Sequence, residues 1–234
     1  MNETEFVDAL NEIGIVLNDK QIEQFKVYYE TLVKWNEKMN LTAITEKNEV
    51  YEKHFYDCLL ASQMIEFSNQ KICDVGAGAG FPSVPLKIVY PDLEIVIVDS
   101  LEKRIKFLNE LASQLGLDKF KAIAARAEEH AQENKEEYDI VMGRAVARLN
   151  ILDELCIPLV KKGGYFLTLK GRQGEIEHQE ASKGINILGA KLEKMEKYNL
   201  PSDESVRYLI LYKKIKETPN KYPRAFAQIK KKPL

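Results

Sequence analysis

Five short runs of β-branched and other apolar residues alternate with helical patterns in the middle of the chain. They are Lys71–Val75, Glu94–Asp99, Phe120–Ala124, Tyr138–Met142 and Tyr165–Leu169. Their apolar residues are continuous rather than alternating, which is typical of strands that are covered on both faces. Strands that alternate with helices form parallel sheets. The sequence therefore predicts an α/β fold, in which a mostly parallel sheet is sandwiched between helices.

The two ends of the chain differ from this middle part. Apolar residues recur at three- and four-residue steps from Asn18 to Met39, which predicts an amphipathic helix. Lys191–Tyr198 and Val206–Lys213 face each other across a polar turn, which predicts a terminal antiparallel strand pair. We therefore expect a helical N-terminal extension over residues 1–68, an α/β core over 69–215 and a basic tail over 216–234.

Composition excludes several classes of protein. The chain has 234 residues, of which 45% are hydrophobic and 30% charged, which is ordinary for one globular core. It has no run near the roughly 20 apolar residues that span a bilayer, and Met1–Glu5 is acidic where a secretory signal is basic. Three cysteines without C-x-x-C spacing encode neither a disulfide framework nor a zinc site. We expect a cytoplasmic protein that binds no membrane and no metal.

Charge is distributed unevenly along the chain. The net charge is −2, which argues against a protein that coats nucleic acid. Residues 207–234 nevertheless contain nine basic residues and a single acidic one, Glu217. A tail of this kind either keeps a chain end solvated or binds a polyanion, and composition does not decide between the two.

A glycine-rich loop follows the first predicted strand and opens a helix. Its residues Gly76, Gly78 and Gly80 allow a tight turn and a close approach to a ligand. Asp99 ends the next predicted strand, where a carboxylate can accept hydrogen bonds from both hydroxyls of a ribose. The two features together predict a site for a nucleoside cofactor at the carboxyl edge of the sheet.

The glycine spacing separates two kinds of cofactor. Dinucleotide oxidoreductases favour G-x-G-x-x-G, whereas Phe81 occupies the last glycine position of that template here. An NAD-linked oxidoreductase therefore stays an alternative only. The D-x-G-x-G-x-G loop with its acidic second strand end resembles the Rossmann-like S-adenosylmethionine-dependent methyltransferases, over roughly residues 71–214.

A narrower resemblance extends over nearly the whole chain. It is carried by Trp35-Asn36, Asn40–Ile44, His54 with Asp57, Asp74–Pro82, Asp99–Arg104, Arg126–Glu128, Arg144–Leu149 and Lys221–Arg224. Together these segments resemble the ribosomal RNA small subunit methyltransferase G family, also called glucose-inhibited division protein B. The resemblance implies methylation of guanine N7 at the conventional position 527 of 16S ribosomal RNA, with S-adenosylmethionine as the methyl donor.

The resemblance also implies roles for individual residues. Gly76 and Phe81 hold the cofactor in the first loop, Ala127 and Glu128 flank its adenine, and Arg144 completes the pocket. The full set of expected cofactor-binding residues is Asp74, Gly76, Gly78, Gly80, Phe81, Asp99, Ser100, Ala127, Glu128 and Arg144.

The chemistry of the acceptor limits which catalytic residues are needed. Guanine N7 carries a free lone pair, so no proton is removed before it attacks a methyl group. The chain has no N/D-P-P-Y segment after its fourth predicted strand, and none of its cysteines follows a proline, as the nucleophile of a covalent mechanism would. We therefore expect catalysis by positioning alone, with no general base and no nucleophilic residue.

Basic residues near the predicted cofactor edge are candidates for RNA contact. They are Lys103, Arg104, Arg148, Lys170, Arg172, Arg207 and, in the tail, Arg224. The expected partner is 16S ribosomal RNA or the small ribosomal subunit, with the target guanine in a loop or unstacked. We interpret Trp35, His54 and Asp57 as mainly structural and expect a monomer. A ribosome-assembly factor without catalytic activity stays a second alternative.

Overall fold

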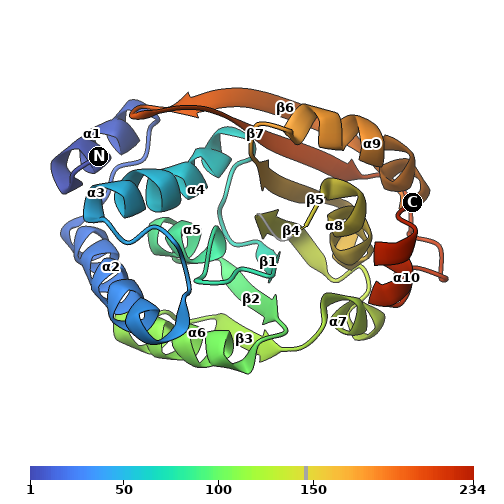
Figure 1. The fold of residues 1–234 in the computed structure, drawn as a ribbon, viewed down its shortest axis with the longest axis horizontal. Coiled ribbons are helices and arrows are strands. Elements are labelled where there is room, and N and C mark those ends of the chain that lie inside the picture. The colour runs from blue at the N-terminus through green and yellow to red at the C-terminus, as the bar shows by residue number, and fades with distance from the viewer. Residues whose placement is uncertain (145–146) are drawn as a thin grey trace.

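The computed structural model describes residues 1–144 and 147–234, and its centre is one seven-stranded sheet with the order β3-β2-β1-β4-β5-β7-β6 (Figure 1). The strands are β1 (Lys71–Val75), β2 (Glu94–Asp99), β3 (Phe120–Ala124), β4 (Tyr138–Arg144), β5 (Val160–Lys170), β6 (Ala190–Leu200) and β7 (Asp203–Lys214). The predicted α/β class is confirmed.

Strands β1 to β5 pair in parallel, and β7 pairs antiparallel with both β5 and β6. In register, Val75 lies opposite Val98, and Asp99 lies opposite Ala124. The carboxyl ends of the central strands therefore meet at one edge of the sheet, where open α/β sheets bind ligands. The antiparallel pair at the end of the sheet is also confirmed.

Helices cover both faces of the sheet (Figure 1). One face carries α5 (Ser83–Val89) and α6 (Glu102–Leu115), and the other carries α7 (Ala127–Glu133), α8 (Leu149–Cys156) and α9 (Gly174–Ile187). Two hydrophobic clusters result, one on each face, because successive strand residues point to opposite sides. For example, Ile72 belongs to the first cluster and Cys73 to the second.

The N-terminal part is helical, as the sequence predicts. It comprises α1 (Glu3–Glu12), α2 (Asp19–Met39), α3 (Lys47–Val50), a π-helical turn η1 (Tyr51–Tyr56), α4 (Asp57–Leu59) and a 3₁₀ turn η2 (Leu60–Gln63). Asn18 caps α2 in a reciprocal capping box with Gln21, and α2 ends at Asn40, which takes a left-handed conformation with φ of 47°. Helix α2 packs against α5 and α6.

Apolar residues of the N-terminal helices belong to the same hydrophobic cluster as one face of the sheet. Phe25 and Leu32 of α2, for example, share it with Ile95 and Leu108. The N-terminal helices therefore complete the core of the sheet and are not a separate core. The division into residues 1–68, 69–215 and 216–234 remains a proposal. None of the helices among the described residues is long and apolar enough to cross a bilayer.

The C-terminal segment folds back onto the second face of the sheet. A short 3₁₀ turn, η3 (Ile157–Leu159), follows α8, and the last helix, α10 (Phe226–Lys231), packs against α8. Thr218, Tyr222 and Ile229 are buried. The basic charge of this segment therefore sits on a packed structure rather than on a free arm.

Candidate functional site

A cavity of about 440 Å³ opens at the carboxyl edge of the sheet. This volume is typical of sites for small molecules and cofactors. Eight of the ten residues that the sequence predicts for a cofactor line it: Gly76, Gly78, Phe81, Asp99, Ser100, Ala127, Glu128 and Arg144. The fold therefore brings together, around one cavity, residues that span almost 70 positions of the sequence.

The glycine loop after β1 lines the cavity. Gly76, Gly78 and Gly80 all have positive φ angles, of 70°, 60° and 94°, which residues other than glycine rarely adopt. Nothing lies within 4 Å of the place where a Cβ of Gly78 would stand, so this glycine leaves open space in the cavity. A Cβ at Gly80 would instead meet Val84 at 2.7 Å and the Tyr28 hydroxyl at 2.9 Å.

Asp74 and Tyr28, which do not line the cavity, support the glycine loop from behind. Asp74 is fully buried, and its Oδ2 accepts a hydrogen bond of 3.1 Å from the backbone N–H of Ser83, while its Oδ1 has no partner. Burial raises the pKa of Asp74 to about 7. The hydroxyl of Tyr28, on α2, donates to the carbonyl of Ala79 at 2.6 Å. The N-terminal helices therefore help to hold the loop in its shape.

Asp99 ends β2, lines the cavity and is only 3% exposed. Its Oδ1 accepts a hydrogen bond of 3.0 Å from the backbone N–H of Leu101, and its Oδ2 accepts one of 3.1 Å from Arg104. A carboxylate offers about four lone-pair sites, so two remain for a ligand. Arg104, predicted to contact RNA, lies here at the cavity wall as the ionic partner of Asp99.

Arg144 ends β4, lines the cavity and contacts the N-terminal helices. Its guanidinium donates to the Lys53 carbonyl at 2.7 Å, to Cys58 Sγ at 2.9 Å and pairs with Asp57 at 3.0 Å. Asp57 also pairs with Arg207 at 3.6 Å and accepts a hydrogen bond from Tyr198. These contacts fix the Arg144 guanidinium in one orientation.

His54 stands against the cavity on the side of Arg144. Its ring stacks on Phe81 with a centroid distance of 4.4 Å, and its Nε2 lies 2.9 Å from the Thr42 hydroxyl. Burial, with the nearby Arg144 charge, lowers the pKa of His54 to about 3, so the ring is neutral. The sequence favours a structural role for this residue, and the structure adds that it forms part of the cavity wall.

The basic residues predicted to contact RNA fall into two groups. Lys103, Arg148 and Arg172 are exposed, with Arg148 paired to Glu180. Lys170, in contrast, is buried and ion-paired with Glu177, and Arg224 binds Glu154, which is completely buried. Since Lys170 presents little surface to a phosphate, its geometry favours a structural role.

Leu41, Thr42, Arg126, Leu155 and Phe226 are among the residues that line the cavity but are absent from the predicted set of cofactor and RNA contacts. Leu41, Thr42 and Arg126 belong to segments that carry the family resemblance, and this resemblance could have identified them. Leu155 and Phe226 lie outside those segments, so nothing in the sequence pointed to them. Of the Arg144–Leu149 segment, Ala145 and Val146 lie outside the described residues.

Comparison with known proteins agrees with these observations. Residues 21–206 match the family model described as GidB, rRNA small subunit methyltransferase G. The chain is 54% identical, over its full length and 99% of the relative, to the ribosomal RNA small subunit methyltransferase G of Macrococcus caseolyticus. It is also 54% identical to the protein of the same name from Lysinibacillus sphaericus, over 96% of this chain and 95% of that one.

Solved structures share the fold at low sequence identity. A precorrin-6y C5,15-methyltransferase from Geobacter metallireducens has a TM-score of 0.53 at 15% identity, over 73% of this chain and 90% of that one. The TYW2 protein of M. jannaschii, solved in complex with AdoMet, has a TM-score of 0.54 at 16% identity, over 68% and 76% of the two chains. The arrangement of strands and helices is therefore that of a Rossmann-like methyltransferase.

Proposed function

The chain belongs to the rRNA small subunit methyltransferase G family, and on this basis we propose that it transfers a methyl group from S-adenosylmethionine to guanine N7 of 16S ribosomal RNA, at conventional position 527. The observation that carries the proposal is the cavity at the sheet edge, where the glycine loop, the Asp99 carboxylate and the turn after β3 surround one space. The family supplies the nature of the reaction, and the cavity supplies a place for it.

The residues around the cavity fit an adenosine that carries a methionine chain. Gly78 leaves open a cradle that any side chain would fill. The buried Asp99 carboxylate retains acceptor sites for the two ribose hydroxyls. Ala127 and Glu128 border the cavity beyond Asp99, where they would flank the adenine, and Arg144 and Phe81 border the opposite end. Asp74 and Gly80 would act through the shape of the loop.

S-adenosylmethionine supplies an electrophilic methyl group when it is bound. The task of the chain is then to place the acceptor nitrogen in line with that group and to exclude water. The neutral His54 ring, stacked on Phe81, and the fixed Arg144 guanidinium border the end of the cavity where the acceptor must enter. No proton has to leave guanine N7, so none of these residues needs to act as a base.

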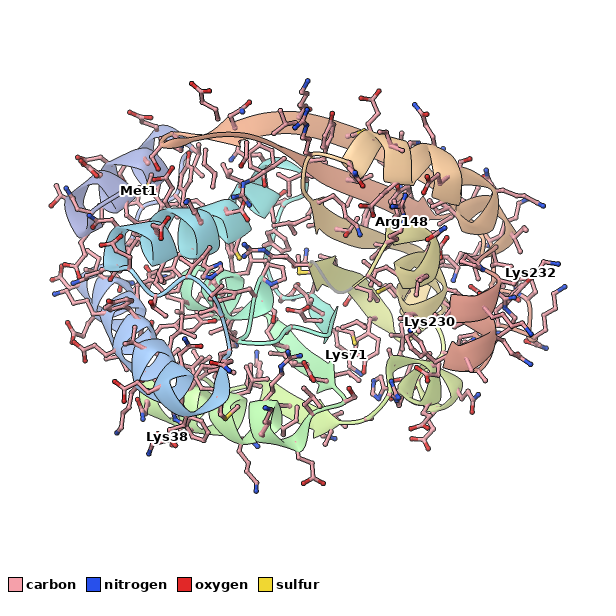
Figure 2. All side chains as sticks on the ribbon, in the orientation of Figure 1. Met1, Lys38, Lys71, Arg148, Lys230 and Lys232 are labelled. Atoms are coloured by element: carbon pink, nitrogen blue, oxygen red, sulfur yellow. The ribbon has the colours of Figure 1, made fainter. Side chains whose placement is uncertain are left out.

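We propose that RNA approaches across the exposed cations near this edge, Lys103, Arg148 and Arg172. Arg207 and Arg224, which are paired with Asp57 and Glu154, add to the positive charge. Figure 2 shows Arg148 on the same side of the molecule as Lys230 of α10 and Lys232, which follows that helix. Phosphate contacts of this kind position an RNA without reading its sequence. The partner is 16S ribosomal RNA, free or within the small ribosomal subunit, and the site of action is the cytoplasm, where the protein works as a monomer.

A thermal-shift measurement separates this proposal from an NAD-linked oxidoreductase. S-adenosylhomocysteine at 100 times its dissociation constant stabilises the folded protein by about 2.7 kcal/mol, so the melting temperature should rise. NAD and NADH should leave it unchanged, and the reverse pattern would contradict the proposal. Transfer of labelled methyl groups to 16S ribosomal RNA separates an active enzyme from an assembly factor, which would bind RNA without transferring label.

A further inference from the structure

We propose that Phe226, at the start of the C-terminal helix α10, forms the aromatic wall against which the adenine of the cofactor stacks. This inference rests on the proposed use of S-adenosylmethionine. It gives the C-terminal segment a role in cofactor binding, in addition to the positive charge that it presents to RNA.

The Phe226 ring lies at the cavity, close to the turn after β3. Phe226 lines the same cavity as Ala127 and Glu128, although almost 100 residues separate them in the sequence. The guanidinium carbon of Arg126, which precedes Ala127, lies 5.4 Å from the centre of the Phe226 ring. The ring therefore stands at the end of the cavity formed by the turn after β3, on the far side of Asp99 from Arg144.

The chemistry of that end suits a flat, weakly polar base. Ala125, Ala127 and Leu155 supply small or apolar surfaces there, and Phe226 adds an aromatic face. The other aromatic rings that line the cavity, among the residues that the structure describes, are Phe81 and His54, which stack on each other at the opposite end. At the end of the cavity formed by the turn after β3, Phe226 is therefore the one aromatic ring in the described lining.

The backbone around Phe226 is held firmly, so the ring is in place before a ligand binds. On one side, Arg224 donates to the buried Glu154 from its backbone N–H at 2.8 Å and from Nη2 at 2.6 Å. On the other side, Ile229 is completely buried in the hydrophobic cluster of the second sheet face. A wall that is fixed in advance binds more tightly because less conformational entropy is lost on binding.

Calorimetric titration with S-adenosylhomocysteine tests the proposal without any need for catalysis. Phe226→Ala should raise the dissociation constant about tenfold, the effect expected when one base loses an aromatic stacking partner. Phe226→Tyr should keep the dissociation constant within about twofold of wild type, because it keeps the aromatic face. Gln228→Ala, at an exposed position of the same helix outside the cavity, is the matched control and should bind like wild type.

A second measurement reports stacking directly. The chain has one tryptophan, Trp35, so the double variant Trp35→Phe/Phe226→Trp carries its only indole at the proposed wall. Saturation with S-adenosylhomocysteine should quench its fluorescence with the dissociation constant that calorimetry gives. Phe226→Leu, which keeps the apolar contacts of the helix, replaces the alanine variant if the latter does not fold.

The outcomes distinguish the role of Phe226 from the proposed use of S-adenosylmethionine. Wild-type binding by the alanine and leucine variants, with no quenching of the indole, would overturn the role of Phe226 while the cofactor assignment stood. Failure of the wild-type protein itself to bind S-adenosylhomocysteine would overturn the proposed function, and this inference with it.

Discussion

The ion pair between Arg224 and Glu154 gives a quantitative test of how the C-terminal segment is held. Glu154 lies on α8 with a completely buried side chain, and the Arg224 side chain is 22% exposed. Three hydrogen bonds, of 2.9, 3.1 and 2.6 Å, join the guanidinium to the carboxylate. Arg224→Met removes all three and keeps most of the apolar volume of the side chain.

The expected loss follows from what the substitution leaves behind. A buried charge whose partner has been removed typically costs about 3–5 kcal/mol, and the partial exposure of Arg224 places the value near the lower end, at about 3 kcal/mol. In urea, with a denaturant slope of about 3 kcal/mol per molar, the unfolding midpoint should fall by about 1 M. Glu154→Gln in the same chain should restore at least half of the loss, because a neutral amide is cheaper to bury.

Equilibrium urea unfolding, followed by circular dichroism, measures all three variants on one scale. Arg148→Met is the matched control, because its pair with Glu180 joins two exposed side chains and its loss should leave the midpoint essentially unchanged. A midpoint for Arg224→Met within about 0.2 M of wild type would refute the reasoning. Strictly additive effects of the Arg224 and Glu154 substitutions would refute it equally, because residues that interact directly are coupled.

Three further predictions concern the cavity. Gly80→Ala should destabilise the protein by about 2–4 kcal/mol in urea unfolding, because the methyl group would collide with Val84 and Tyr28 at a positive φ. Gly78→Ala has open space around it and should lower the free energy of unfolding by only about 1–2 kcal/mol. Equal losses in the two variants would contradict the difference in packing. Asp99→Ala should weaken binding of S-adenosylhomocysteine roughly 100-fold or more in calorimetry, because two ribose hydroxyls lose a charged acceptor, and wild-type affinity would remove Asp99 from the site. Burial lowers the pKa of His54 to about 3 from a usual 6.5, so below about pH 6.5 the unfolded chain binds a proton that the folded chain does not bind. The free energy of unfolding should therefore fall by up to about 1.4 kcal/mol per pH unit as the pH drops below about 6.5. This slope should be shallower in His54→Gln, and identical slopes would contradict a neutral buried ring.

Local patterns were sufficient to predict the sheet. Apolar runs such as Glu94–Asp99 are strands because their residues are buried on both faces, and this information lies within a few neighbouring positions. The glycine loop was predictable for the same reason, since the positive φ angles of Gly76, Gly78 and Gly80 select glycine locally. The antiparallel pair of β6 and β7 followed from two runs joined by a short turn.

The remaining walls of the cavity come from distant parts of the chain and could not be predicted from local patterns. Phe226 reaches the cavity because Arg224 and Ile229 anchor the C-terminal segment on the second face of the sheet, and neither contact can be recognised from the neighbouring sequence. The buried position of Lys170 was hidden likewise, because its partner Glu177 lies on the following helix. A count of charges shows how many cations a segment carries, and only the fold shows which of them have acidic partners.

The proposed reaction is the methylation of one ring nitrogen of one guanine. It is tested most directly by incubating the purified protein with labelled S-adenosylmethionine and small ribosomal subunits from cells that lack it, and then cleaving the RNA chemically at N7-methylated guanines. We expect one new strand break, at conventional position 527 of 16S ribosomal RNA, together with one label per subunit. Label at another nucleotide, or incorporated label without cleavage at that guanine, would contradict it.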